Sequence, residues 1–145
     1  MAAPKAHVCI VIAASILYAT TVRAHHSFGA EYDAQRPVTV TGVVTKVEWT
    51  NPHCHFYVDV PNQSGGAAVN WKFEGYGIGP LYRNGWKRDV TMKAGDRVTV
   101  TGWGARDGGS WGQAREITLP NGQKMFFGPP VGTGDGGNAP AVEVK

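Results

Sequence analysis

The chain has 145 residues, a length typical of one domain, and a formal net charge of +3 at pH 7. Its 20 glycines, 9 prolines and 5 tryptophans favour turns and strands and argue against a helical bundle. The charged residues form no basic stripe of the kind that neutralises phosphates, so the sequence argues against nucleic acid as a partner.

Residues 1–24 have the pattern of a cleavable secretory signal peptide. Lys5 supplies a positive start, the run from Val8 to Ala19 is almost wholly apolar, and Val22-Arg23-Ala24 offers a cleavage site after Ala24. The alternative is an uncleaved anchor, but a membrane span needs about 20 apolar residues and this run is shorter. We therefore expect a secreted or periplasmic protein that has no stable membrane anchor after cleavage.

Cleavage would leave a nearly neutral mature chain with a single cysteine. It removes Lys5, Arg23 and Cys9, so that 12 basic and 11 acidic residues remain, a formal net charge of +1. Cys54 then has no partner for an intramolecular disulfide. Its thiol is expected to be buried, bound to a metal or paired with another chain.

The mature part of the chain, residues 25–127, is expected to fold as an all-β domain. Its first residues, 25–36, show no hydrophobic period and are interpreted as an N-terminal arm. Pro37 then begins a strand that runs to Trp49. The apolar residues of this strand change face at Gly42, as they do at a β-bulge.

After a turn at Asn51-Pro52, the segment from His53 to Val60 alternates as a strand with two different faces. One face is apolar and contains Cys54, Phe56, Val58 and Val60. The other face carries His53, His55, Tyr57 and Asp59. The first face is therefore expected to line the core, with the thiol buried, and the second to face outward.

The rest of the mature chain predicts three further strands, a short helical turn and a last hairpin. The strands cover residues 69–74, 97–103 and 114–119, the helical turn covers 80–86, and the Asn121-Gly122 hairpin leads into a final strand over 123–127. This order is typical of a small OB-like barrel of five to six strands with one short helical connector; a small open sandwich is the alternative. Residues 128–145 are expected to be a disordered C-terminal tail.

Several segments between His25 and about Phe127 together resemble a family of small secreted bacterial proteins of unknown function. They are the opening HHSF, the strand PVTVTGVVTKVEWTNPH and, further along, WKFEG, RNGWKRD, KAGDRVTVTGW and AREITLPNGQKMF. The resemblance implies a secreted β-domain and brings no established activity with it. The stretch HCHFYVDV departs from the family pattern, in which a small and an aromatic residue follow the first histidine, so His53 carries the resemblance more than His55 does.

The first candidate site is the N-terminus that cleavage after Ala24 would create. The mature chain would start with His25 and His26, and a free amine beside an imidazole can chelate one metal ion through both nitrogens. The amine has a pKa near 8, so it loses its proton readily at neutral pH. Nitrogen-rich sites of tetragonal shape favour Cu(II), so copper is the expected metal. The alternative is an exposed tail without a ligand.

The second candidate is the pair His53 and His55, whose side chains project from one face of a strand roughly 7 Å apart. That spacing allows both imidazoles to reach one metal ion, while Cys54 between them points to the opposite face. The alternative is a pair of surface histidines. The combined hypothesis is a metal site formed by His25, His26, His53 and His55, and possible extra ligands are Glu31, Asp33 and Asp59.

Aromatic residues supply the alternative hypothesis of a module that binds a non-metal ligand or a protein. Trp49 and Trp71 fit the inward phase of their strands, whereas Trp86 and Trp111 lie in glycine-bearing segments and are interpreted as surface residues. Arg83, Lys87 and Arg88 beside Trp86 could form a basic–aromatic patch for an anion, or simply a solvated face.

The sequence has none of the common catalytic motifs. It lacks a serine in a glycine elbow, a phosphate-binding loop and a zinc-protease helix. A binding protein is therefore favoured over an enzyme, and a copper-dependent redox enzyme is the weakest of the three hypotheses.

Overall fold

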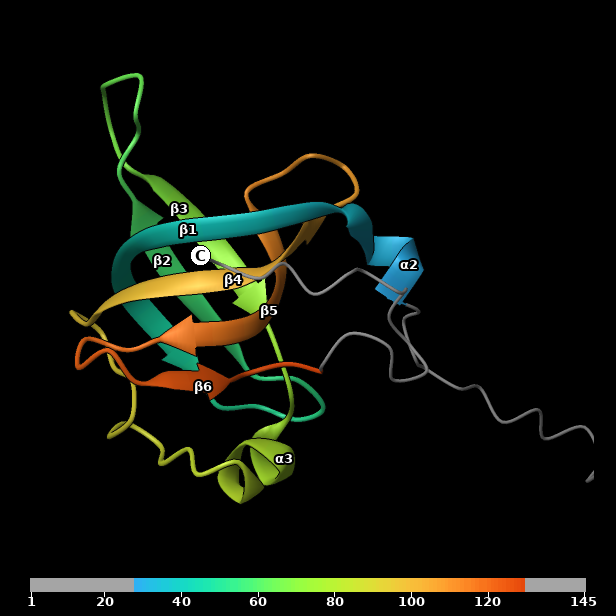
Figure 1. The fold of residues 1–145 in the computed structure, drawn as a ribbon, viewed down its shortest axis with the longest axis vertical. Coiled ribbons are helices and arrows are strands. Elements are labelled where there is room, and N and C mark those ends of the chain that lie inside the picture. The colour runs from blue at the N-terminus through green and yellow to red at the C-terminus, as the bar shows by residue number, and fades with distance from the viewer. Residues whose placement is uncertain (1–27, 130–145) are drawn as a thin grey trace, which may run out of the picture.

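The computed structural model describes residues 28–129, and its element order is given in Figure 1. The elements are α2 (Phe28–Glu31), β1 (Tyr32–Glu48), β2 (His55–Val60), β3 (Val69–Glu74), α3 (Ile78–Arg83), β4 (Arg97–Ala105), β5 (Trp111–Thr118) and β6 (Lys124–Phe126). The expected signal peptide over 1–24, the two histidines His25 and His26, and residues 130–145 of the expected tail lie outside the described residues.

The strands form one sheet in the order β3-β2-β1-β4-β5-β6, and a further pairing between β3 and β5 closes the first five into a ring. The pairings around the ring are antiparallel, except that β3 and β5 run parallel. The helix α3 lies between β3 and β4 in the chain and at one end of the ring in space (Figure 1). The prediction of an all-β domain with one short helical connector in an OB-like order is confirmed.

The core inside the ring is built from the inward faces that the alternation predicts. Cys54, Phe56 and Val58 of the second strand segment are fully buried, and Val98 and Val100 of β4 are buried with them. Phe56 stacks on Phe73 of β3 at a ring-centroid distance of 5.4 Å. Burial of apolar side chains on this scale is the main force that holds a domain of this size together.

Trp86 is a correction to the sequence-based interpretation, which placed this side chain on the surface. It is 2% exposed, packs against the Phe127 ring at 5.1 Å and donates a hydrogen bond from Nε1 to the carbonyl oxygen of Phe126 at 2.8 Å. The glycine-bearing segment therefore turns the indole inward, because a partner 40 residues away in the chain satisfies its only polar atom. Arg83, Lys87 and Arg88 are exposed, but the Trp86 indole is buried, so these three side chains do not form the basic–aromatic patch with it.

The first strand also differs from its prediction at two points. It begins at Tyr32 rather than at Pro37, because the expected arm pairs with the end of β4 through Tyr32 and Ala105. The irregularity against β2 lies between Val44 and Lys46 rather than at Gly42. At Gly42 the two strands instead come so close that a Cβ there would lie 2.3 Å from the carbonyl oxygen of Asp59.

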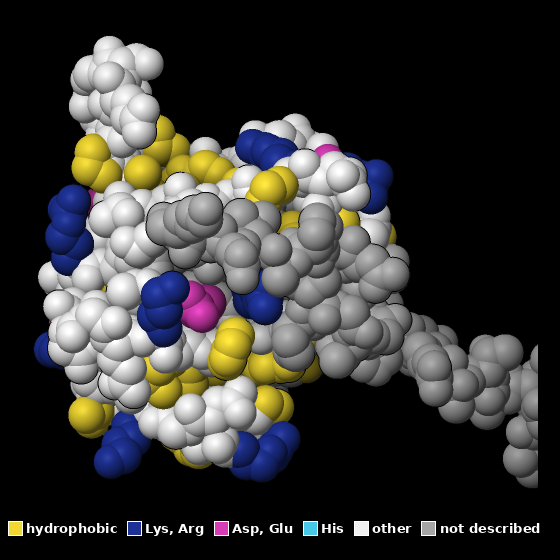
Figure 2. Space-filling view, in the orientation of Figure 1, with side chains coloured by type: hydrophobic (Ala, Val, Ile, Leu, Met, Phe, Trp, Pro, Cys, Tyr) yellow, Lys and Arg dark blue, Asp and Glu magenta, His cyan; other side chains and the backbone are white. Residues whose placement is uncertain are grey.

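Charged side chains are dispersed on one face of the described domain (Figure 2). On the face that Figure 2 shows, lysine and arginine side chains stand apart from one another, and apolar and uncharged polar side chains lie between them. Within residues 28–129, neither helix is long or apolar enough to cross a membrane.

Candidate functional site

The candidate site lies on the outer face of the ring, where strand pairing brings polar side chains into one row. His55 of β2 pairs with Glu74 of β3, Glu74 pairs with Gln113 of β5, and Gln113 pairs with Trp103 of β4. Side chains of directly paired residues point to the same face of a sheet. The row therefore crosses four strands of the ring, with Glu74 near its middle.

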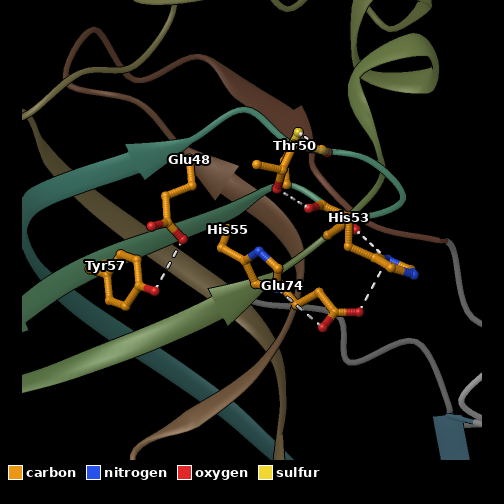
Figure 3. Close-up of polar contacts among 8 residues, drawn as sticks. Glu48, Thr50, His53, His55, Tyr57 and Glu74 are labelled. Atoms are coloured by element: carbon orange, nitrogen blue, oxygen red, sulfur yellow. Dashed lines mark hydrogen bonds and ion pairs between the residues drawn. The ribbon is translucent and has the colours of Figure 1, made fainter.

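Glu74 lies between the two strand histidines, and both rings point toward it (Figure 3). Nδ1 of His53 lies 3.1 Å from Oε1 of the carboxylate, and Nε2 of His55 lies 3.4 Å from Oε2. Nδ1 of His53 also lies 3.0 Å from the carbonyl oxygen of Gly75. The histidine pair that the sequence singles out thus shares one carboxylate that sequence reasoning did not include.

Backbone hydrogen bonds hold His53 in place although it lies just outside β2. The hydroxyl of Thr50 donates to the His53 carbonyl oxygen at 2.7 Å. The next residue, Cys54, receives a hydrogen bond from the Gly75 amide and donates one to the carbonyl of Tyr76, each at 3.0 Å. His53 is therefore fixed between a turn and the end of β3, on the side of the chain where the Glu74 carboxylate lies.

The two imidazoles differ in exposure, and the carboxylate is charged. The side chain of His53 is 48% exposed, that of His55 20% and that of Glu74 23%. Burial acts to raise the pKa of the Glu74 carboxyl, but the hydrogen bond with His55 and the neighbouring His53 outweigh it and hold that pKa below its ordinary value. Glu74 is therefore an anion at neutral pH, with one histidine ring accessible beside it.

An aromatic cluster brings the start of the described chain to the same site. Phe28 of α2, Tyr32 and Trp103 form this cluster on the outer face of the ring, separate from the main core, and Trp111 packs against it. Burial and the nearby carboxylates of Glu74 and Glu31 raise the pKa of the Tyr32 phenol. The Tyr32 hydroxyl and the side-chain oxygen of Gln113 are buried and have no hydrogen-bond partner among residues 28–129.

The remaining candidates from the sequence take other roles. Cys54 is fully buried on the core side, as predicted, and burial raises the pKa of its thiol, which donates to the Thr50 carbonyl at 3.4 Å. Asp59 accepts a hydrogen bond from Asn70 at 2.7 Å, and Asp33 accepts one from the Gln35 amide at 2.9 Å. Among the described residues, neither carboxylate lies within ion-pair distance of His53 or His55, whereas Glu74 contacts both.

A second carboxylate, Glu48, borders the site through its pairing with His55. It forms an ion pair with Lys46 and accepts a hydrogen bond from the Tyr57 hydroxyl at 3.2 Å. The hydrogen bond from Lys46 lowers the pKa of Glu48. Glu48 is therefore engaged by its own strand and by Tyr57.

Trp111 was expected on the surface, and its side chain is half-buried. Its ring meets that of Tyr32 edge-on at 5.5 Å, and its Nε1 donates to the Asp107 carboxylate at 3.1 Å. It therefore supports the aromatic cluster that covers the outer face next to the site. Within residues 28–129, no three histidine, cysteine, aspartate or glutamate side chains are arranged to hold a metal ion by themselves.

Comparison with known proteins gives a family and no function. The model of a family of unknown function, DUF6152, matches residues 13–114, which include β1 to β4 and the start of β5. No curated protein matches the chain.

Proposed function

The chain belongs to this family of unknown function, DUF6152. From the signal-like pattern of residues 1–24 and the geometry around Glu74, we propose that it is a secreted or periplasmic metal-binding protein with a preference for copper. The proposed ligands are the amine and imidazole of His25, together with His53; His26 and His55 are alternative donors. The observation that carries the proposal is the half-exposed His53 ring, whose Nδ1 is held by Glu74 and Gly75 while its Nε2 forms no hydrogen bond or ion pair with residues 28–129.

The position of the N-terminal residues along the chain supports the proposal. His25 precedes Phe28 by three residues, which span at most about 10 Å when extended. The Phe28 ring lies 5.4 Å from the Tyr32 ring, and the charge of Glu74 is close enough to Tyr32 to help raise the pKa of its phenol. In the proposal, residues 25–27 cross this cluster and bring His25 to the accessible side of His53.

The chemistry of the donors favours copper. Each imidazole and the terminal amine offer a nitrogen lone pair, and nitrogen donors suit Cu(II) in a tetragonal arrangement. The described residues alone do not form a complete ligand set, and the proposal takes the remaining nitrogen donors from the N-terminal residues. In the proposed function, signal-peptide cleavage creates the amine donor, so the protein binds copper only after processing.

Calorimetric copper titration of the processed protein tests the proposal, after intact-mass measurement has shown that its chain starts at His25. We expect one Cu(II) per chain. One extra residue before His25 should weaken binding strongly, because it separates the amine from the chelating imidazole, and His53→Ala should weaken it as well.

Two results would contradict the proposal. A secreted protein whose mass retains residues 1–24 would remove the terminal amine as a ligand. Equal copper affinity in the parent, the extended protein and His53→Ala would show that no such site exists. The alternative of a module that binds a non-metal ligand or a protein would then replace it.

A further inference from the structure

The contacts of His53 fix which of its nitrogens carries the proton. Its Nδ1 faces two oxygens, the carbonyl oxygen of Gly75 at 3.0 Å and Oε1 of Glu74 at 3.1 Å. A carbonyl oxygen and a carboxylate can only accept hydrogen bonds. Nδ1 must therefore be the donor, and in the neutral ring the lone pair is then on Nε2.

The contact of His55 fixes the opposite arrangement in the second ring. Its Nε2 faces the other oxygen of the same carboxylate at 3.4 Å, so that Nε2 carries the proton and the lone pair is on Nδ1. The side chain of His55 is also 20% exposed, against 48% for His53. The lone pair available to a metal ion is therefore on Nε2 in His53 and on Nδ1 in His55, and His53 is the more accessible side chain of the two.

We propose that Glu74 is the positioning residue of the metal site: it orients His53 so that Nε2 is the donor atom, and it holds the Nε2–H of His55, which makes His53 the preferred strand ligand of the two. This inference rests on the proposed function and deepens it. A carboxylate that accepts from the non-ligating nitrogen of a histidine fixes its ring and raises its basicity, and its loss typically costs about 10–100-fold in metal affinity.

The sheet offers a matched control for Glu74. Glu116 of β5 is also a strand carboxylate with an ion-pair partner, at 3.2 Å from Lys124, and its side chain is 24% exposed against 23% for Glu74. It is not paired with a histidine. Glu74→Gln and Glu116→Gln therefore remove carboxylates of equal exposure, and only the first removes the acceptor between the two histidines.

The first test needs no metal. Two-bond ¹H–¹⁵N correlation spectra of the metal-free processed protein at neutral pH report which nitrogen of each ring is protonated. We expect the Nδ1–H form for His53 and the Nε2–H form for His55. Glu74→Gln should shift the His55 ring signals toward a mixture of both forms, and Glu116→Gln should leave them unchanged. A parent His53 in the Nε2–H form would overturn the inference.

The second test is copper titration of the same proteins. Glu74→Gln should lose about 10–100-fold in affinity, while Glu116→Gln stays close to the parent and His55→Ala loses less than His53→Ala. If the parent binds copper and Glu74→Gln binds it equally well, the positioning role is wrong while the proposed function stands. A loss in His55→Ala as large as that in His53→Ala would make His55 a ligand and overturn the inference. If the parent binds no copper, both fail.

Discussion

Phe127 provides the sharpest test of the core, because its chain neighbour Phe126 serves as the control. Phe127 is fully buried, whereas Phe126 is 49% exposed. The Phe127 ring meets Phe56 edge-on at 4.9 Å and Trp86 edge-on at 5.1 Å. Replacing each phenylalanine in turn by alanine removes the same atoms from the two sides of one short segment.

The expected cost of Phe127→Ala is about 3–5 kcal/mol in the free energy of unfolding, the usual range for a buried phenylalanine. The upper half of that range applies here, since the ring also packs closely on the backbone at Gly75, the residue that follows β3. A Cβ on Gly75 would lie 2.1 Å from the ring of Phe127, so the cavity has a rigid wall. Phe126→Ala should cost below about 1 kcal/mol, since its side chain is half exposed.

Denaturant unfolding measures both changes as shifts of the midpoint at an unchanged slope. Domains of this kind have a total stability of about 5–15 kcal/mol, so Phe127→Ala can remove a large part of it. Should that variant not fold, Phe127→Leu keeps most of the apolar volume and gives a smaller measurable loss. Equal costs at positions 126 and 127 would refute the assignment of Phe127 to the core.

Three further predictions concern other parts of the domain. Gly102→Ala should destabilise the domain by about 1–3 kcal/mol or more, because its Cβ would lie 1.9 Å from the Gln113 carbonyl oxygen. Gly29 has open space around it, so Gly29→Ala is the control and should be neutral or stabilising. Thermal unfolding of both variants measures the difference. The thiol of Cys54 should react with a thiol reagent far more slowly in native than in unfolded protein; equal rates would contradict its burial. The folded pKa of Glu74 lies below its ordinary value of about 4.3, so its stabilising effect is present above that pH and is lost as the pH falls through the folded pKa. The stability difference between the parent and Glu74→Gln should therefore shrink on acidification from about pH 5 to pH 3, and a constant difference would refute the shift.

The strands and their order follow from local patterns in the sequence. The alternation of Cys54, Phe56 and Val58 with polar residues assigns one side of β2 to the core, and the structure buries all three. The Asn121-Gly122 turn joins β5 to β6 as predicted, and Gly122 has a positive φ of 82°. Each of these patterns involves residues that are close together in the chain, so the sequence alone is sufficient to predict the element.

Features that depend on distant partners were not predictable in this way. The segment from Tyr32 to Arg36 has no alternation, and it becomes strand only because Tyr32 pairs with Ala105 at the end of β4. Trp86 is buried because the carbonyl oxygen of Phe126 accepts from its indole nitrogen. Both contacts join parts of the chain that no local period connects.

The candidate site also combines features that local sequence predicts with one that depends on a distant partner. The outward phase of His55 follows from the alternation of its strand, and Glu74 lies on the polar side of its own strand in the same way. What the sequence does not contain is the register that places Glu74 opposite His55. A shift of one residue would turn one of the two side chains to the other face, so only the assembled sheet identifies the carboxylate.

Electron paramagnetic resonance of the copper-loaded processed protein tests the central claim most directly, because it reports the nitrogen atoms bound to the metal. We expect a tetragonal Cu(II) spectrum with nitrogen hyperfine structure, in which His53→Ala removes one imidazole nitrogen. A residue added before His25 should change the spectrum again, through loss of the amine. Identical spectra for the parent, the extended protein and His53→Ala would contradict the claim that the mature N-terminus and His53 share one metal ion.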